Sequence, residues 1–141
     1  GINMEVVDKL YSTTLQSHPV THSRLKFLSE LAQTSEDHVS RLGIALSVSN
    51  PVSDYSWSPT ISKEEEVFIS ESSVKHIRGR TLFKDDIELW MALVLRENTP
   101  LNYEEWRNCF KFHWEKGVEL LMAKALENGD WLRTMNACIK P

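Results

Sequence analysis

Residues 102–129 read NYEEWRNCFKFHWEKGVELLMAKALENG and carry the strongest helical signals in the chain. Asn102 followed by Glu105 resembles a capping box at a helix start, and Asn128-Gly129 is a C-cap signal. Apolar residues recur every three or four positions between these signals, so we predict one helix, about 38 Å long. Its inward stripe is Trp106, Phe110, His113, Gly117, Leu121 and Lys124, broadened by Cys109, Val118, Leu120 and Ala125.

Gly117 interrupts this stripe. A glycine inside a helix costs about 1 kcal/mol relative to alanine, so a packing reason for it is expected. We predict that Gly117 lies where a second helix crosses closely.

The N-terminal part predicts a short strand followed by two helices. Residues 9–15 are rich in β-branched and aromatic side chains and predict the strand, which ends at His18-Pro19. Ser17 is the expected N-cap of a helix running from Val20 to Ala32. Ser35, with acidic residues after it, predicts the start of a second helix that ends at Val48. This second helix is apolar nearly all round, which favours burial or contact with another subunit.

The middle of the chain contains weaker signals. Residues 49–62 include two prolines and several serines and predict a loop. Glu64–Glu66 is expected to be solvated, residues 67–69 to form a short strand, and residues 74–80 to be irregular and basic. Asp85 or Asp86 is expected to cap a further helix that ends near residues 98–100.

Length and composition indicate one mainly α domain over residues 1–141. The chain is 41% hydrophobic and 26% charged, which is typical of a compact globular protein. We expect Met4 to be the natural start and residues 1–3 to be an added remnant. With no apolar run of about 20 residues, no signal peptide and only two cysteines, we expect a cytoplasmic protein without a membrane segment.

Residues that could support catalysis are scattered. His18 and His22 have metal-binding spacing, but Pro19 lies between them and no third ligand is evident, so we expect no metal site. His113 is expected to be a packed histidine, and a helix cap explains Asp85-Asp86 better than a magnesium site does. No phosphate loop, nucleophile elbow or paired-cysteine motif is present. We therefore predict a binding protein with no enzymatic activity and no cofactor.

Any contact with DNA must come from a local group of cations. The formal net charge is −4, which argues against coating nucleic acid through bulk charge. The strand–helix–helix order resembles a ribbon-helix-helix module, in which two chains pair their strands. The candidate phosphate-binding residues are Arg24, Lys26, Arg41, Lys75, Arg78 and Arg80. The alternative is a solvated basic loop that pairs with Glu64–Glu66.

Three stretches resemble the DndE family of DNA sulfur-modification (phosphorothioation) proteins. They are Arg41-Leu42-Gly43-Ile44-Ala45-Leu46-Ser47-Val48, Arg80-Thr81-Leu82-Phe83 and His113-Trp114-Glu115-Lys116-Gly117. Their order and spacing agree with the family over residues 20–127. Lys84 replaces the family's glycine after the second stretch, and residues 33–38 depart from its usual turn.

The resemblance implies a small helical homo-oligomer, a tetramer, without an active site. It implies binding of duplex or nicked DNA, beside a cysteine desulfurase, a sulfurtransferase and an ATPase. Two other functions stay open: a ribbon-helix-helix regulator that recognises operator DNA, and, less favoured, a nuclease that nicks DNA.

Overall fold

A computed structural model describes residues 2–50, 52 and 54–139. The mainly α class is confirmed. The helices are α1 (Met4–Ser12), α2 (Pro19–Ala32), α3 (Glu36–Val48), α4 (Gly79–Phe83), α5 (Ile87–Leu95), α6 (Tyr103–Asn128) and α7 (Trp131–Ile139), with a 3₁₀ turn, η1 (Glu66–Phe68). Strands β1 (Thr14–Gln16) and β2 (His76–Arg78) form a two-stranded sheet. No described helix combines the length and apolar character needed to cross a membrane.

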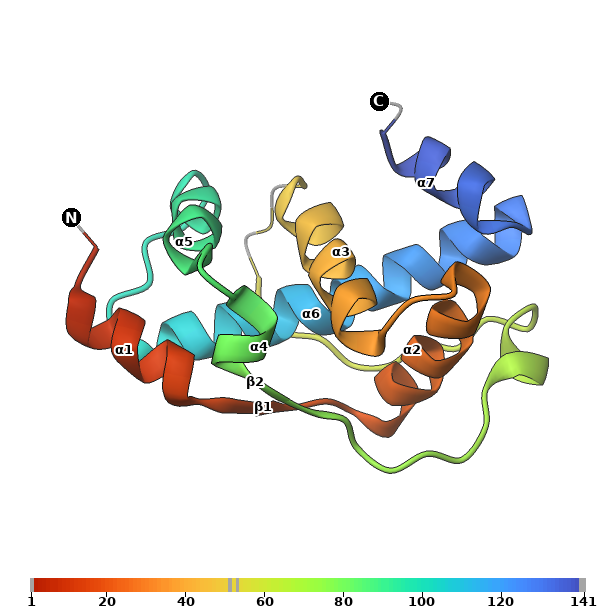
Figure 1. Ribbon diagram of the computed structural model, residues 1–141, viewed down its shortest axis with the longest axis horizontal. Coiled ribbons are helices and arrows are strands. Elements are labelled where there is room, and N and C mark those ends of the chain that lie inside the picture. The colour runs from red at the N-terminus through yellow and green to blue at the C-terminus, as the bar shows by residue number, and fades with distance from the viewer. Residues whose placement is uncertain (1, 51, 53, 140–141) are drawn as a thin grey trace.

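Helix α6 is the axis around which the other elements are arranged (Figure 1). It begins at the predicted cap, where the Asn102 side chain accepts a hydrogen bond from Glu105 N, and it ends at Gly129, whose φ is +85°. Helix α3 crosses it, and α7 turns back beside its C-terminal end. The predicted helix over residues 102–129 is therefore confirmed.

The crossing of α3 and α6 is the most extensive contact between two elements of the described chain. A Cβ atom on Gly117 would overlap the backbone carbonyl of Gly43, so these helices touch backbone to backbone. Ser40 and Ser47 of α3 reach the same helix, with Oγ atoms 2.9 Å from Trp114 Nε1 and 2.8 Å from His113 Nδ1. The prediction that Gly117 lies at a close helix crossing is confirmed.

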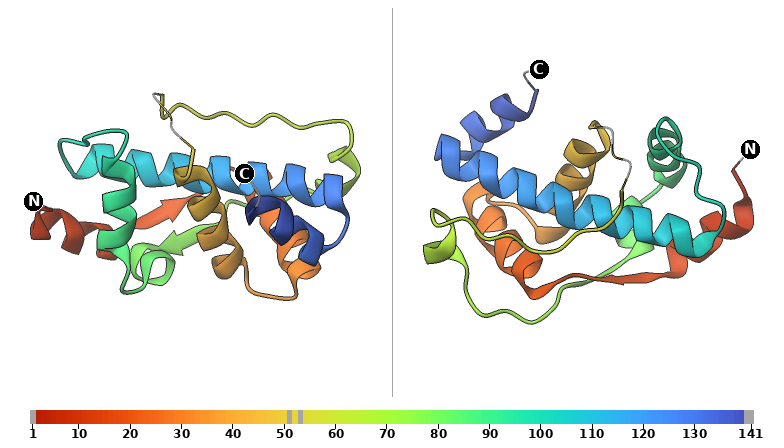
Figure 2. Two further views of the ribbon diagram at one scale, coloured as in Figure 1. Left: turned by 90° about the horizontal axis from the view of Figure 1, so that it is seen from above. Right: turned by 180° about the vertical axis from the view of Figure 1, so that it is seen from behind.

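Residues 54–75, here called the strap, lie between α3 and β2 in the chain; their first part passes along α6, and the part after η1 returns beside α2 (Figure 2). Aromatic contacts fix its first part, since the Tyr55 ring packs edge-on against Phe112 and His113. Further along, Glu65 is buried and accepts hydrogen bonds from Arg24. The expected loop over residues 49–62 is confirmed for residues 49, 50, 52 and 54–62. Residues 51 and 53 lie outside the described part of the chain. The expected strand over residues 67–69 is wrong, because Glu66–Phe68 form η1.

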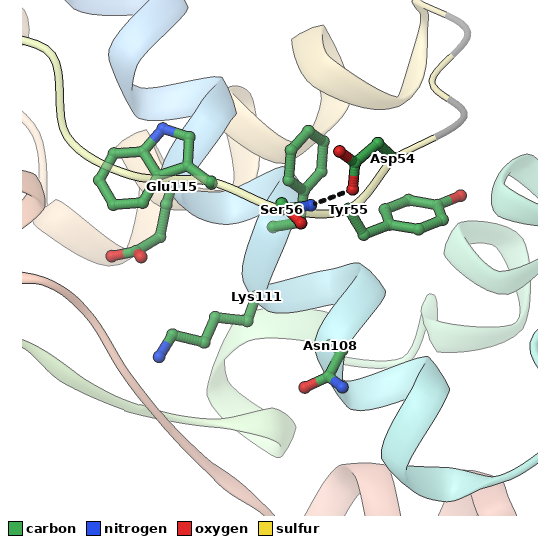
Figure 3. Close-up of a pocket in the computed structure, with 8 residues that line it drawn as sticks. Asp54, Tyr55, Ser56, Asn108, Lys111 and Glu115 are labelled. Atoms are coloured by element: carbon green, nitrogen blue, oxygen red, sulfur yellow. Dashed lines mark hydrogen bonds between the residues drawn. The ribbon is translucent and has the colours of Figure 1, made fainter.

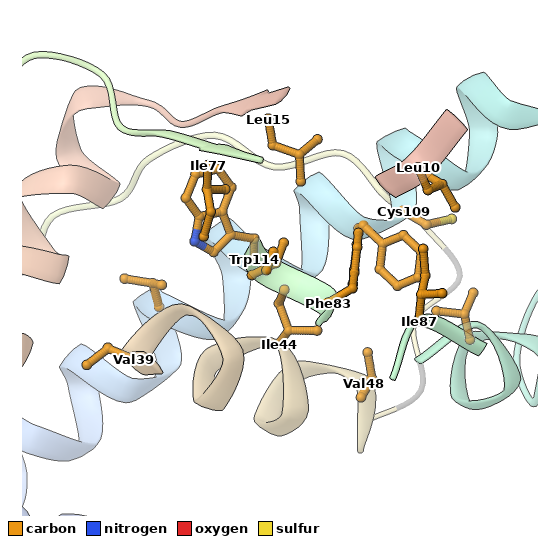
Figure 4. Close-up of a cluster of buried hydrophobic side chains, with 14 of the residues drawn as sticks. Leu10, Leu15, Val39, Ile44, Val48, Ile77, Phe83, Ile87, Cys109 and Trp114 are labelled. Atoms are coloured by element: carbon orange, nitrogen blue, oxygen red, sulfur yellow. The ribbon is translucent and has the colours of Figure 1, made fainter. Parts of the chain in front are cut away.

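The apolar core lies between α6, α3, α4, α5 and the inner face of the sheet (Figure 4). Leu15 and Ile77, opposite each other in the sheet, both point into it. The core includes Leu10, Leu15, Val39, Ile44, Val48, Ile77, Phe83, Ile87, Cys109 and Trp114. One core therefore joins the N-terminal and C-terminal halves, as expected for a single domain.

The predicted strand over residues 9–15 is only partly correct. Residues up to Ser12 belong to α1, which starts at the Asn3 cap and buries Val7 and Leu10 three residues apart. Helical burial of this pair outweighs the local β preference. The strand itself is Thr14–Gln16, and it pairs antiparallel with His76–Arg78, which we had predicted to be irregular. The strand thus pairs within its own chain, unlike the two-chain ribbon of a ribbon-helix-helix module.

Helix boundaries correct three smaller expectations. His18, not Ser17, caps α2, because its Nδ1 accepts a hydrogen bond from Val20 N. Asp86 occupies the N-cap position of α5 without a side-chain capping bond, and α5 ends at Leu95, before residues 98–100. Ser35 caps α3 as predicted.

We predict that Gly117→Ala lowers the free energy of unfolding by about 2–4 kcal/mol, since the added methyl group must displace backbone. Gly43→Ala is the matched control from the other side of the crossing. Its Cβ would lie 3.0 Å from Val118 N, so a smaller loss is expected. Chemical denaturation of both variants measures the difference. Equal stability of the parent and Gly117→Ala would contradict the close crossing.

Candidate nucleic-acid interface

Arg24, one of the six predicted phosphate-binding residues, is completely buried. Its guanidinium donates to both carboxylate oxygens of Glu65, at 3.1 and 2.8 Å, and to the carbonyl oxygen of Thr60 at 2.7 Å. Glu119 lies 3.8 Å from its remaining nitrogen. A buried, paired guanidinium cannot reach a phosphate without leaving its partners unpaired. The prediction for Arg24 is therefore corrected: this residue fastens the strap to α2.

Lys75 is also engaged, in ion pairs with two carboxylates. Its ammonium lies 3.3 Å from Glu36 and 3.4 Å from Asp37, and only 21% of its side chain is exposed. These two acids form the first turn of α3, so the positive charge of Lys75 is locally neutralised. Lys26 is exposed on α2 and donates to Ser72 Oγ, away from the sheet. Both lysines are therefore engaged by other side chains.

The remaining three predicted residues lie around β2 and α4. Arg78 ends β2 and is exposed, and Arg80 is exposed in the first turn of α4, with its guanidinium 5.1 Å from the centre of the Tyr11 ring. Arg41 donates to the carbonyl oxygen of Thr81 at 3.2 Å, which places it beside α4. The structure thus places Arg41, which is distant in sequence, beside the α4 segment that carries Arg80, and the role of the three arginines in DNA binding stays a prediction.

Two cations that the sequence did not single out, Arg107 and Lys111, come from α6. Arg107 of α6 donates to the carbonyl oxygen of Thr14 at 2.9 Å, and Thr14 is the residue opposite Arg78 in the sheet. Lys111 lies one turn further along α6 on the same side. One more turn on, Glu115 accepts a hydrogen bond from His18 N at 2.6 Å, so β1 follows this row of side chains. Arg107, Lys111 and Glu115 are spaced four residues apart, which places them on one side of a helix. This spacing is the sequence pattern that could have identified them.

These residues define a surface that we call the ribbon face. Because side chains alternate along a strand, Leu15 and Ile77 point inward while their neighbours point outward. The ribbon face consists of Thr14, Gln16, His76, Arg78, Arg107 and Lys111. It combines Arg78 and hydrogen-bonding side chains of the two-stranded ribbon with two cations of α6, a combination suited to phosphate contacts.

A pocket of about 390 Å³ adjoins the ribbon face, between the start of the strap and α6 (Figure 3). Its lining is Asp54, Tyr55, Ser56, Trp57, Asn108, Lys111, Phe112 and Glu115. Burial raises the pKa of Tyr55 to about 12, so its hydroxyl stays protonated at neutral pH. Lys111 belongs to both surfaces and therefore links the pocket to the ribbon face.

His113 lies in the core and not at a reaction centre. Its ring is fully buried, and Nδ1 is 2.8 Å from Ser47 Oγ, while Nε2 has no partner among the described residues. Burial lowers the pKa of His113 to about 4, which keeps the ring neutral at pH 7. The structure thus agrees with a packed histidine.

The other metal-binding candidates do not form a constellation. His18 caps α2, whereas His22 contacts Ser73 O and Glu36. Within residues 2–50, 52 and 54–139, no group of three or more His, Cys, Asp or Glu side chains is arranged to hold a metal ion. The absence of a cofactor and of enzymatic activity stays a prediction.

We predict that stability falls as the pH drops from about 6.5 towards 4. In this window the unfolded chain protonates His113, whose ordinary pKa is 6.5, while the folded chain does not. The expected loss is up to about 1.4 kcal/mol per pH unit. Urea unfolding across this range measures it, and His113→Gln should show a flatter dependence. The same slope in parent and variant would assign the acid sensitivity to other groups.

Comparison with known proteins adds no relative: no protein-family model, no curated protein and no solved structure matches the chain.

Proposed function

We propose that this protein is a DNA-binding accessory subunit that contacts the phosphate backbone through its ribbon face and catalyses no reaction itself. The observation that supports this most directly is the placement of Arg107 on Thr14, opposite Arg78. It places a cation of α6 at the edge of the ribbon that carries Arg78. Such contacts position a protein on nucleic acid without reading its sequence.

The assignment to DNA sulfur modification rests on the resemblance to the DndE family. Two of the three resembling stretches meet at the crossing of α3 and α6, through Gly43 and Gly117 and through Ser47 and His113. The third forms most of α4, which packs against α3. The resemblance therefore concerns residues that build the fold. On this basis we propose a cytoplasmic protein that acts beside a desulfurase, a sulfurtransferase and an ATPase.

The ribbon-helix-helix regulator is less well supported. In that class the ribbon forms between two chains, whereas β1 here pairs with β2 of the same chain, and Arg107 occupies the carbonyl oxygen of Thr14. Pairing with a second copy through the outer edge of β1 would require the Arg107 contact to break.

We also propose that the protein forms a homo-oligomer, a tetramer as the resemblance implies. An apolar groove of about 380 Å³ runs between α3, α6 and α7, and a second copy covers it in this proposal. It is lined by Leu42, Ala45, Leu46, Ser49, Leu121, Met135, Cys138 and Ile139. Ile139 is 81% exposed in the isolated chain, which leaves its apolar surface available to a partner.

For DNA, we predict modest affinity that depends steeply on salt. Replacing Arg78, Arg107 and Lys111 with glutamine should weaken duplex binding and reduce the log–log salt slope by about 2 to 3, since each phosphate contact contributes about 0.9. The control replaces Lys63, Lys124 and Arg133, which lie outside the ribbon face, and so removes the same charge. Fluorescence anisotropy over a salt series measures both. Equal losses of duplex affinity in the two triple variants would show that net charge alone explains the effect. No binding by the parent at low salt would refute the proposal.

For assembly, light scattering at micromolar concentration should give a multiple of 16.3 kDa. Leu46→Glu should shift the protein towards the monomer, because a charge in the groove opposes burial by a second copy. Val67→Glu, at a position 82% exposed on η1, is the control and should leave the mass unchanged. A monomeric parent would contradict the proposal.

A further inference from the structure

The pocket between the strap and α6 combines aromatic walls with three kinds of polar group. Trp57 and Phe112 form apolar walls, and the Trp57 ring packs edge-on against His18 with centroids 6.1 Å apart. No described residue accepts a hydrogen bond from Trp57 Nε1, so packing alone orients this ring. The pocket volume of about 390 Å³ falls in the usual range for small-ligand sites.

The polar groups of the pocket differ in charge and in hydrogen-bonding capacity. Glu115 is buried, and its Oε1 accepts the His18 N–H at 2.6 Å; among the described residues its Oε2 has no partner. Oε2 is thus free to accept from a ligand. Lys111 provides a cation, and no described side chain forms an ion pair with it. Asn108, one turn before Phe112, adds an amide at the rim (Figure 3).

We propose that this pocket binds one unpaired nucleobase that bears an exocyclic amine, with the attached phosphate on Lys111. This inference rests on the proposed function, because the ribbon face that would hold the strand adjoins the pocket at Lys111. Base–aromatic stacking supplies affinity without a sequence requirement, and the Trp57 and Phe112 walls offer it. A carboxylate that can only accept hydrogen bonds selects the amine of cytosine or adenine over the carbonyl of thymine.

Two ligands present the base and phosphate that this pocket would recognise: a free nucleotide, and an unstacked base within a single strand. A strand gains further phosphate contacts on Arg107 and Arg78, whereas a mononucleotide does not. Single-stranded oligonucleotides should therefore bind more tightly than dCMP or dAMP, and a fully paired duplex should leave the pocket empty.

The first experiment uses an oligonucleotide with one 2-aminopurine, which loses fluorescence when it stacks on an aromatic ring. Binding of the full chain should quench the single-stranded probe and leave the duplex probe unchanged. Trp57→Ser should weaken binding about tenfold, the usual order for one stacked base, and Trp57→Phe should retain most of it. Trp131→Ser, outside the pocket on α7, is the matched control and should bind like the parent.

The second experiment tests the specificity. In Glu115→Gln, the side-chain oxygen still accepts the His18 N–H and the amide now presents donors to the pocket. The parent should bind oligo-dC or oligo-dA more tightly than oligo-dT. The variant should show the opposite preference and bind oligo-dT more tightly. Circular dichroism and thermal unfolding confirm that each variant is folded.

The outcomes separate this inference from the proposed function. Trp57→Ser with unchanged single-strand binding, or a parent that does not distinguish the oligonucleotides, overturns the base pocket. Neither outcome alters the salt-dependent binding of duplex DNA, which tests the ribbon face. Binding of dCMP equal to that of the oligonucleotide identifies a free-nucleotide site and overturns the strand as the source.

Discussion

The fold depends on the contact between the backbones of Gly43 and Gly117. Without side chains at these positions, α3 and α6 approach closely enough for Ser40 and Ser47 to reach Trp114 and His113. A larger residue at position 117 would separate the helices and leave the indole N–H and the imidazole without these partners, and unpaired buried polar groups are costly. The close approach therefore comes first, and the buried hydrogen bonds are possible only because of it.

The position of α6 then determines where the surface groups lie. Its inward stripe fixes the helix against α3, so Arg107, Lys111 and Glu115 follow one another along the side that meets β1. The ribbon face and the base pocket are both consequences of this row. The buried pair of Arg24 and Glu65 acts separately, by fastening the strap that closes the pocket's other side.

Sequence periodicity predicted α2, α3, α5 and α6 and the role of Gly117, because these features depend on local spacing. It missed α1, α4, α7 and the pairing of β1 with β2. Pairing of two three-residue strands whose central residues, Leu15 and Ile77, are 62 positions apart depends on tertiary contacts that no local pattern reports. The same limit applies to the candidate site. The sequence predicted Arg78 as a surface cation, but it could not predict the burial of Arg24, because that burial depends on Glu65, which was expected to be solvated.

The acidic net charge is consistent with a local group of cations because several carboxylates are paired internally. Glu65 neutralises Arg24 in the interior, and Glu36 neutralises Lys75 at the start of α3. A formal charge counts all of these groups equally, whereas a phosphate responds to charges within about 10 Å in moderate salt. The charge at the ribbon face is therefore set by Arg78, Arg107 and Lys111 together with Glu115, one turn from Lys111, and the sum over the chain says little about it.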